Sequence, residues 1–195
     1  MKEVVFASNN KHKIKEVRQI LGGFKVLSLE DIGLKEDIEE TGTTFLENAL
    51  IKARAATEFL RTRGRSLEVI ADDSGLCVEA LSGAPGVFSA RYAKEHNAAA
   101  NRAKLLKELE GNKNRRAYFE CVFVRMQPDG EFNYGVGKTH GTILEEETGD
   151  NSFGYDCLFF SDDLNKSFGK ADADEKNTVS HRARAIKDCF KLGSK

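Results

Sequence analysis

The stretch Ile70-Ala71-Asp72-Asp73-Ser74-Gly75-Leu76 decides the fold prediction, because an apolar run ends there in two adjacent carboxylates and a Ser-Gly pair. The run over 67–71 is typical of a buried strand that is bounded by a turn. Adjacent anions at a strand end repel each other, and burial increases that repulsion. A divalent cation relieves it, and magnesium is typically held by one or two carboxylates together with substrate phosphates. The alternative is a solvated acidic turn.

Strands and helices alternate on both sides of this stretch. In the first half, hydrophobic periodicity and caps predict a strand over 4–7, a helix over 14–21, a capped helix over 44–60 and strands over 67–71 and 76–81. In the second half, they predict a helix over 97–109, a hairpin of strands over 117–126 and 131–139, a strand over 155–160 and a last helix capped by Ser180. The change from alternation to a hairpin predicts an α/β fold with a mixed sheet that is flanked by helices.

Length and composition limit the class of protein. A chain of 195 residues predicts one domain over 1–195, with a sizeable core and room for two lobes. The net charge of -1 gives no basic field for nucleic-acid binding. No apolar stretch is long enough to span a membrane, and the first residues are not typical of a signal peptide. None of the four cysteines forms a C-x-x-C pair, which argues against zinc and fits a reducing cytoplasm.

Four segments at element boundaries carry candidate chemistry. The first joins a strand to a helix N-terminus, where backbone N–H groups and the helix dipole favour an anion. Its candidate binding residues are Ser8, Asn9, Asn10, Lys11, His12 and Lys13. A plain capped strand–helix turn is the alternative, because the segment lacks the Gly-rich pattern of a P-loop.

The second segment is the acidic run that begins at Glu39 and Glu40, directly before the predicted helix over 44–60. These carboxylates either complement the dipole of that helix or provide metal oxygens that face Asp73. Lys52 lies two turns into the same helix, where an exposed lysine is the plain interpretation.

The third and fourth segments combine aromatic, acidic and cationic side chains. Phe153, Gly154, Tyr155 and Asp156 suit a flat ring, which would stack on the aromatics and meet a polar edge; core packing at a strand entrance is the alternative. Lys176, His181 and Arg182 surround a predicted helix start, where cations oppose the dipole. That mismatch indicates either a ligand or a simple charged helix start.

Six motifs, in this order, resemble those of the inosine triphosphate pyrophosphatase family. They extend over nearly the whole chain and read S-x-N-x-x-K, E-E-T-G-T-T-F-x-E-N-A, A-D-D-S-G-L, G-A-P-G-V-x-S-A-R-Y, F-G-Y-D and S-H-R. The resemblance implies an elongated α/β fold with two lobes around a cleft. It also implies magnesium-dependent hydrolysis of non-canonical purine nucleoside triphosphates (ITP, dITP and XTP) to a monophosphate and pyrophosphate, by a homodimer.

The resemblance also implies roles for individual residues. Asp73 matches the general base and, with Glu40, the metal ligands. The matching substrate contacts are Ser8 to Lys13, Lys52, Ser74, Phe153 to Asp156, Lys176, His181 and Arg182. Two departures from the family pattern concern the base pocket, since Asn151-Ser152 stand before F-G-Y-D and Cys157 after it.

The chemistry of these residues is consistent with water attack, because lysines and a metal neutralise a triphosphate and no activated nucleophile is evident. Two alternatives stay open: a nucleotide-binding module that does not hydrolyse, and a pyrophosphatase for modified pyrimidine nucleotides. For a purine substrate, donors on His181 and Arg182 favour a keto oxygen at position 6 over the amino group of adenine.

Overall fold

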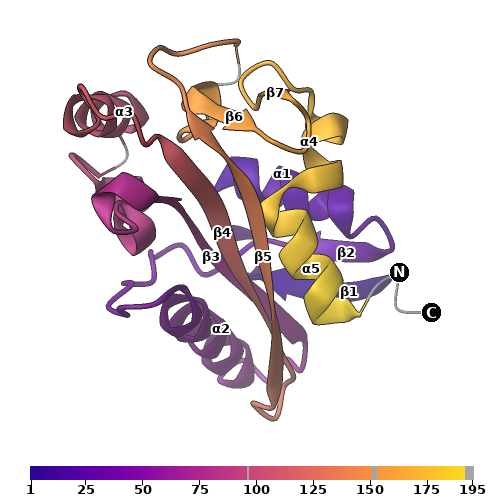
Figure 1. Cartoon of the computed structure of the whole chain (residues 1–195). Coiled ribbons are helices and arrows are strands. Elements are labelled where there is room, and N and C mark those ends of the chain that lie inside the picture. The colour runs from indigo at the N-terminus through magenta and orange to yellow at the C-terminus, as the bar shows by residue number, and fades with distance from the viewer. Residues whose placement is uncertain (96, 151–152, 192–195) are drawn as a thin grey trace. The chain divides into compact units, whose positions relative to one another are not determined.

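The computed structural model describes residues 1–95, 97–150 and 153–191. Its strands form one sheet in the order β2-β1-β3-β4-β5-β6-β7 (Figure 1). Their bounds are β1 Lys2–Phe6, β2 Phe24–Leu27, β3 Glu68–Val78, β4 Arg116–Met126, β5 Phe132–Ile143, β6 Phe159–Ser161 and β7 Lys166–Ser167. β1 pairs in parallel with β2 and β3, whereas β5, β6 and β7 pair antiparallel. The prediction of an α/β fold with a mixed sheet is confirmed.

In the described residues, the α-helices alternate with the strands as far as β4, and the last two α-helices follow β7. The α-helices are α1 Lys11–Ile20, α2 Phe45–Arg61, α3 Ala98–Glu108, α4 Ala173–Val179 and α5 His181–Phe190. The short 3-10 helices are η1 Glu30–Ile32, η2 Glu79–Leu81, η3 Gly86–Arg91 and η4 Asp156–Leu158. The predicted capping box is present, since Thr44 and Glu47 exchange side-chain to backbone hydrogen bonds at the start of α2.

The chain divides into two compact units. Unit 1 comprises Met1–Asp73, Cys121–Gly137 and Arg182–Lys195, and unit 2 comprises Ser74–Glu120 and Lys138–His181. Each unit has its own core. A single domain with two lobes stays a prediction.

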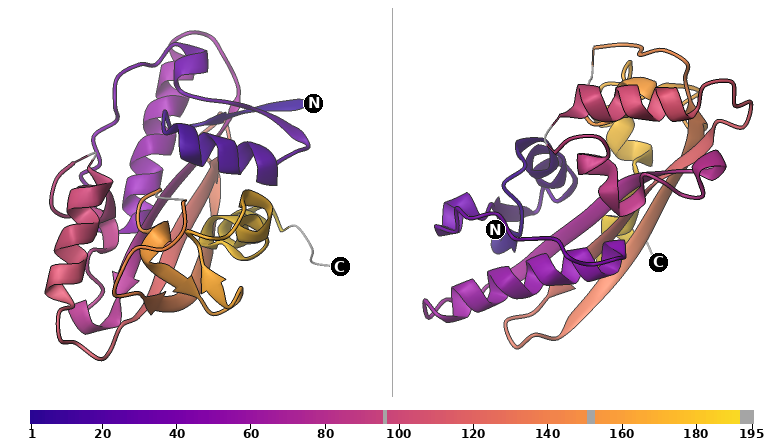
Figure 2. Two further views of the ribbon diagram at one scale, coloured as in Figure 1. Left: turned by 90° about the horizontal axis from the view of Figure 1, so that it is seen from above. Right: turned by 90° about the vertical axis from the view of Figure 1, so that its left-hand side faces the viewer.

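In unit 1, alternation along the strands divides the core between two faces of the sheet. Val4 and Phe6 belong to the cluster that contains residues of α1 and α5, whereas Val5 and Ala7 belong to the cluster that contains residues of α2. Successive strand residues point to opposite faces, so helices cover both sides of β1. Two further views show α1 and α2 on opposite sides of it (Figure 2).

In unit 2, the core is rich in aromatic rings. Phe119 packs against Phe159 and Phe168, with ring centroids 4.7 and 6.3 Å away. Leu105 and Leu109 of α3 are fully buried in the same cluster, as the helical spacing predicts.

The prediction of a strand end and turn at Asp72 to Gly75 is wrong. β3 runs without a break from Glu68 to Val78, so both carboxylates lie inside one strand. The path of β3 requires a glycine at position 75. Any other residue would place a Cβ 2.2 Å from the carbonyl oxygen of Gly86, which is a steric clash. The Ser-Gly pair therefore marks a close backbone approach within a strand, which is the other meaning of glycine in a strand pattern.

Two predictions in the second half need correction as well. The strand over 155–160 is wrong, because Asp156–Leu158 forms a 3-10 turn and β6 begins only at Phe159. The charged segment before the last helix is itself helical: α4 ends at Val179, and Ser180 is its C-cap. Lys176 thus lies in the last turn of α4, where a cation suits the dipole.

Candidate functional site

Asp72 and Asp73 extend from β3 toward opposite faces of the sheet in unit 1. β1 pairs with β3 only as far as Ile70, so the two acids follow the last residue of β3 that is paired with β1. Asp72 shares its side of the strand with Ile70 of the α1 and α5 cluster, and Asp73 shares its side with Ala71 of the α2 cluster. Of the two acids, Asp73 is thus the one on the side of α2.

Asp72 is the centre of a buried ionic network. Its Oδ1 accepts a hydrogen bond from Lys13 Nζ at 3.2 Å, and its Oδ2 accepts from Arg182 Nε and NH2 at 3.1 and 2.9 Å. Arg182 also donates to Glu16 on α1. Since Lys13 and Glu16 belong to α1 and Arg182 opens α5, Asp72 ties both helices to β3.

Asp73 makes a separate set of contacts on α2. Its Oδ2 accepts from Asn48 Nδ2 at 3.0 Å, and its Oδ1 lies 3.7 Å from Lys52 Nζ. Lys52 also donates to Glu40 Oε1 at 2.6 Å, while Glu39 is exposed. The fully buried Asn48 in addition accepts from the N–H of Gly42 at 2.8 Å, which fixes the acidic segment beside Asp73.

The two carboxylates differ in pKa. Burial opposes the charge on Asp72, but the cations Lys13 and Arg182 outweigh it and hold the pKa well below its usual range. For Asp73, burial dominates and raises the pKa, with Glu40 adding to the effect and Lys52 opposing it. Asp73 is therefore the stronger base of the two.

Lys52 is the positive charge between Glu40 and Asp73. Burial alone would lower the pKa of its ammonium group, but Asp73, Asp72 and Glu40 together raise it. It is buried, which contradicts the plain interpretation of an exposed helix lysine. Among the described residues, no three His, Cys, Asp or Glu side chains gather as a metal cage.

The predicted phosphate segment is ordered by its own side chains. Ser8 Oγ accepts from the N–H of Asn10 at 3.1 Å, and Asn9 Oδ1 accepts from the N–H of Glu30 at 2.9 Å. Asn10 caps α1, because its Oδ1 accepts from the N–H groups of His12 and Lys13. The capped strand–helix turn is therefore present, and phosphate binding there stays a prediction.

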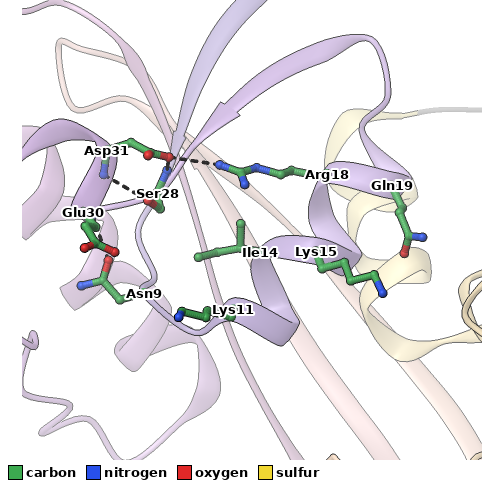
Figure 3. Close-up of a pocket in the computed structure, with 9 residues that line it drawn as sticks. All are labelled: Asn9, Lys11, Ile14, Lys15, Arg18, Gln19, Ser28, Glu30 and Asp31. Atoms are coloured by element: carbon green, nitrogen blue, oxygen red, sulfur yellow. Dashed lines mark hydrogen bonds and ion pairs between the residues drawn. The ribbon is translucent and has the colours of Figure 1, made fainter. Parts of the chain in front are cut away.

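A hollow of about 480 Å³ lies beside this segment (Figure 3). Asn9 and Lys11 belong to both the hollow and the predicted segment. Its other lining residues are Ile14, Lys15, Arg18, Gln19, Ser28, Glu30 and Asp31. Arg18 and Asp31 form an ion pair at 3.0 Å, and Asp31 also accepts from the N–H of Ser28.

In unit 2, the aromatic segment combines a core residue with a more accessible one. Tyr155 is buried in the core, and its hydroxyl donates to the carbonyl of Ser89 at 2.9 Å. Phe153 is only partly buried, and Gly154 has a φ of 56°, a left-handed conformation that favours glycine. Asn151 and Ser152, which precede this segment, lie outside the described residues.

Lys176 is the buried cation of this segment. Its Nζ donates to Asp156 Oδ2 at 2.7 Å and lies 5.6 Å from the centroid of the Phe153 ring. His181 is also buried and stacks on Phe119, with ring centroids 4.9 Å apart. Ser74 lies half-buried in β3. Unit 2 thus brings Phe153, Asp156 and Lys176 together, whereas Arg182 belongs to the Asp72 network of unit 1.

A comparison with protein families matches residues 4–192 to a model described as the Ham1 family. The chain belongs to the Ham1 family. The resemblance inferred from the six motifs is thereby confirmed. Ham1 relatives include the dITP/XTP pyrophosphatase of Clostridium perfringens, 47% identical over 95% of this chain and 94% of its own length. The corresponding enzyme of Bacillus subtilis is 44% identical over 98% and 97%.

Solved Ham1 structures have the same fold. The Staphylococcus aureus Ham1 protein is 41% identical, covers 100% of both chains and superposes with a TM-score of 0.84. A HAM1 protein from Coxiella burnetii is 37% identical, covers 98% of each chain and gives a TM-score of 0.86. Among the described residues of this Ham1 chain, no helix is long and apolar enough to cross a membrane.

Three residues of this Ham1 chain escaped the sequence-based site prediction. Asn48 stands inside the E-N-A motif, so its place next to the acidic run was a usable signal. Arg102 lies on the inward stripe of α3 at helical spacing from Leu105 and Leu109, where a charge is unexpected. For Glu16, nothing in the sequence separates it from an ordinary helix glutamate.

Proposed function

We propose that this chain is a nucleoside triphosphate pyrophosphatase that converts dITP, ITP and XTP to the monophosphate and pyrophosphate. Membership of the Ham1 family supports it, as do the names of the curated relatives, which are dITP/XTP pyrophosphatases. The observation that carries the proposal is the setting of Asp73. It is a buried carboxylate of raised pKa, beside the cation Lys52 that also binds Glu40.

Glu40 and Asp73 are the proposed magnesium ligands. They come from different elements, yet both lie within 3.7 Å of one ammonium group, so a cationic position between two carboxylates already exists. Two carboxylate donors fit magnesium, which takes its other ligands from water and substrate phosphates. When bound, the ion would neutralise charge on the phosphates and favour departure of pyrophosphate.

Asp73 is the proposed general base. It would take a proton from the attacking water while the anhydride bond between the α- and β-phosphates breaks and pyrophosphate leaves with the bonding electron pair. Burial raises its pKa, which makes the ionised form a better proton acceptor than an exposed aspartate. Asn48 holds Asp73 Oδ2 in place, so the orientation of the carboxylate is fixed before substrate binds.

The cations of unit 1 are proposed to neutralise the triphosphate tail. Lys13 stands in the first turn of α1, and its side chain is partly accessible. Ser8, Asn10 and Lys11 stay proposed phosphate contacts, because the segment leads into a helix N-terminus. Lys52 contributes a second positive charge beside Asp73.

The residues of unit 2 are proposed to recognise the purine. Phe153 offers a ring face for stacking, and Lys176 and His181 offer donors for a keto oxygen at position 6. Adenine presents an amino group at that position, so a donor would face a donor. A contact of Arg182 with the purine stays a prediction, since its contacts with Asp72 and Glu16 support a role in holding Asp72.

The test is a panel of dITP, XTP, ITP, GTP and ATP with magnesium, in which pyrophosphate and orthophosphate are measured separately. We expect pyrophosphate in equal amount to monophosphate, with ITP, dITP and XTP far above ATP and with GTP poor. Orthophosphate as the first product would contradict the proposed bond. Binding without hydrolysis would favour a nucleotide-binding module instead.

A further inference from the structure

We propose that Arg102 of α3 is a positioning residue that sets the affinity of the protein for the purine base. This inference rests on the proposed function, because it assigns a role within the base-recognition segment of unit 2. Arg102 is only 7% exposed, although it is an arginine on a helix whose opposite face meets solvent. A guanidinium that is buried this deeply needs hydrogen-bond partners that offset the free-energy cost of its desolvation.

Two hydrogen-bond partners of Arg102 lie on the chain around the base segment. Its NH1 donates to the carbonyl oxygen of Gly154 at 2.9 Å, and its Nε donates to Glu147 Oε1 at 2.7 Å. The two bonds come from different nitrogens of one rigid, planar group. Arg102 therefore fixes two points of the chain relative to α3, one of which is inside the segment that carries Phe153 and Asp156.

The bond to Gly154 determines the direction of a peptide plane. In a trans peptide the carbonyl group and the following N–H point in opposite directions, so holding the Gly154 oxygen also orients the N–H of Tyr155. Gly154 has a φ of 56°, and a glycine has many alternative conformations at low cost. Without the guanidinium, the ring of Phe153 would lose part of the restraint that presents its face.

Among the described residues, other hydrogen bonds hold the neighbours of Gly154. The Tyr155 hydroxyl donates to Ser89, and Asp156 is paired with Lys176. The carbonyl of Cys157 accepts from the N–H of Thr148 at 2.8 Å. The C-terminal side of the segment is thus bound to the unit 2 core, and Arg102 acts at the glycine that precedes it.

The role predicts a selective loss of base affinity. Arg102→Met keeps an unbranched apolar stem and removes the guanidinium with its donors, so binding of IMP should weaken about tenfold. Binding of pyrophosphate, which has no base, should stay within about twofold. With dITP, KM should rise while kcat changes little, since the proton-transfer residues are untouched.

The experiment uses the full chain, with dissociation constants for IMP and pyrophosphate from calorimetry and a thermal melt for each variant. Lys104→Met is the matched control, because Lys104 also lies on α3 and donates to a backbone carbonyl, that of Tyr92, outside the base segment. Arg102→Lys keeps the charge but loses the planar fork, so it should lose part of the IMP affinity.

Equal weakening of IMP and pyrophosphate in Arg102→Met would overturn the inference and leave a purely structural residue. Unchanged IMP binding would overturn it as well. Should Arg102→Met be insoluble, the IMP affinity of Arg102→Lys decides in the same way. A wild-type protein that binds IMP but hydrolyses no dITP would refute the proposed function and leave the Arg102 experiment intact.

Discussion

Asp72 and Asp73 show how a step of one residue along a strand separates two roles. Because side chains alternate between faces, one carboxylate meets α1 and α5 and the other meets α2. The first is surrounded by Lys13 and Arg182, which stabilise its charge. The second is buried with a raised pKa, which suits proton transfer. Substitution of each acid should therefore have a different effect.

Asp73→Asn should lower kcat with dITP by roughly two orders of magnitude or more, because an amide neither accepts the proton nor holds magnesium well. The fold should persist, since Asn48 and Glu40 remain and burial already disfavours the charge of Asp73. Steady-state pyrophosphate release and a thermal melt measure the two effects. A variant of near wild-type rate would remove Asp73 from the mechanism.

Asp72→Asn should instead lower the free energy of unfolding by about 3 kcal/mol, because the cations Lys13 and Arg182 lose the buried charge between them. Urea unfolding followed by circular dichroism measures the change. Asp73→Asn is the natural comparison, and equal stability of the two variants would refute the proposed division of roles.

At the scale of elements, the sequence predicts best where one local rule acts alone. The capping box at Thr44, the hairpin around Gly130 and the amphipathic stripe of α3 each follow from spacing and turn chemistry. For β3 the local pattern is ambiguous, because Gly75 can mark a turn or a close backbone approach, and only the position of Gly86 distinguishes them. That approach is a contact between two segments, and a local pattern does not show it; the same holds for the ion pair of Arg182 with Asp72, which are 110 residues apart.

Because the backbone approaches so closely at Gly75, adding a single methyl group there should lower the stability of the fold strongly. Gly75→Ala would place a Cβ 2.2 Å from the Gly86 oxygen and 2.6 Å from Ser89 Oγ. We expect a loss of about 2–4 kcal/mol in the free energy of unfolding. Gly23→Ala is the control, because a Cβ there meets nothing within 4 Å. Equal melting temperatures of the two variants would contradict the continuous path of β3.

The pKa of Glu68, at the start of β3, makes the stability of the fold depend on pH. Burial opposes its charge, but hydrogen bonds from Arg125, Lys2 and Gln127 outweigh this and lower its pKa to about 2. The pKa of a glutamate in the unfolded chain is near 4.3. At pH values above this, the lowered pKa of Glu68 stabilises the folded state by about 3 kcal/mol. This contribution disappears as the pH falls through about 2.

Glu68→Gln should therefore be less stable than the wild type at pH 7, and the difference should shrink as the pH falls from about 5 to 2. Urea titrations at a series of pH values measure it. Glu36→Gln, at an exposed position, serves as the control. A difference that is independent of pH would show that Glu68 contributes by packing rather than by charge.

At the scale of the whole molecule, the resemblance carried by the six motifs predicts a homodimer. The structure of one chain does not test that prediction. Phe88 of η3 is 56% exposed, a large apolar surface on the turn that follows Gly83-Ala84-Pro85-Gly86. We expect a homodimer, with twice the 21.6 kDa mass of the chain in light scattering at micromolar concentration. Phe88→Asp should shift the mass toward that of one chain, whereas a monomeric wild type would refute the expectation.

The discontinuous make-up of unit 1 has a consequence for synthesis. Arg182 follows its partner Asp72 by 110 residues, and all of unit 2 is translated between them. On the ribosome, the strand that carries both aspartates emerges long before α5 and waits without its guanidinium. The ionic network is then completed only when α5 leaves the exit tunnel. A frameshift late in the gene would therefore damage the centre of unit 1, while leaving nearly all of the earlier chain as encoded.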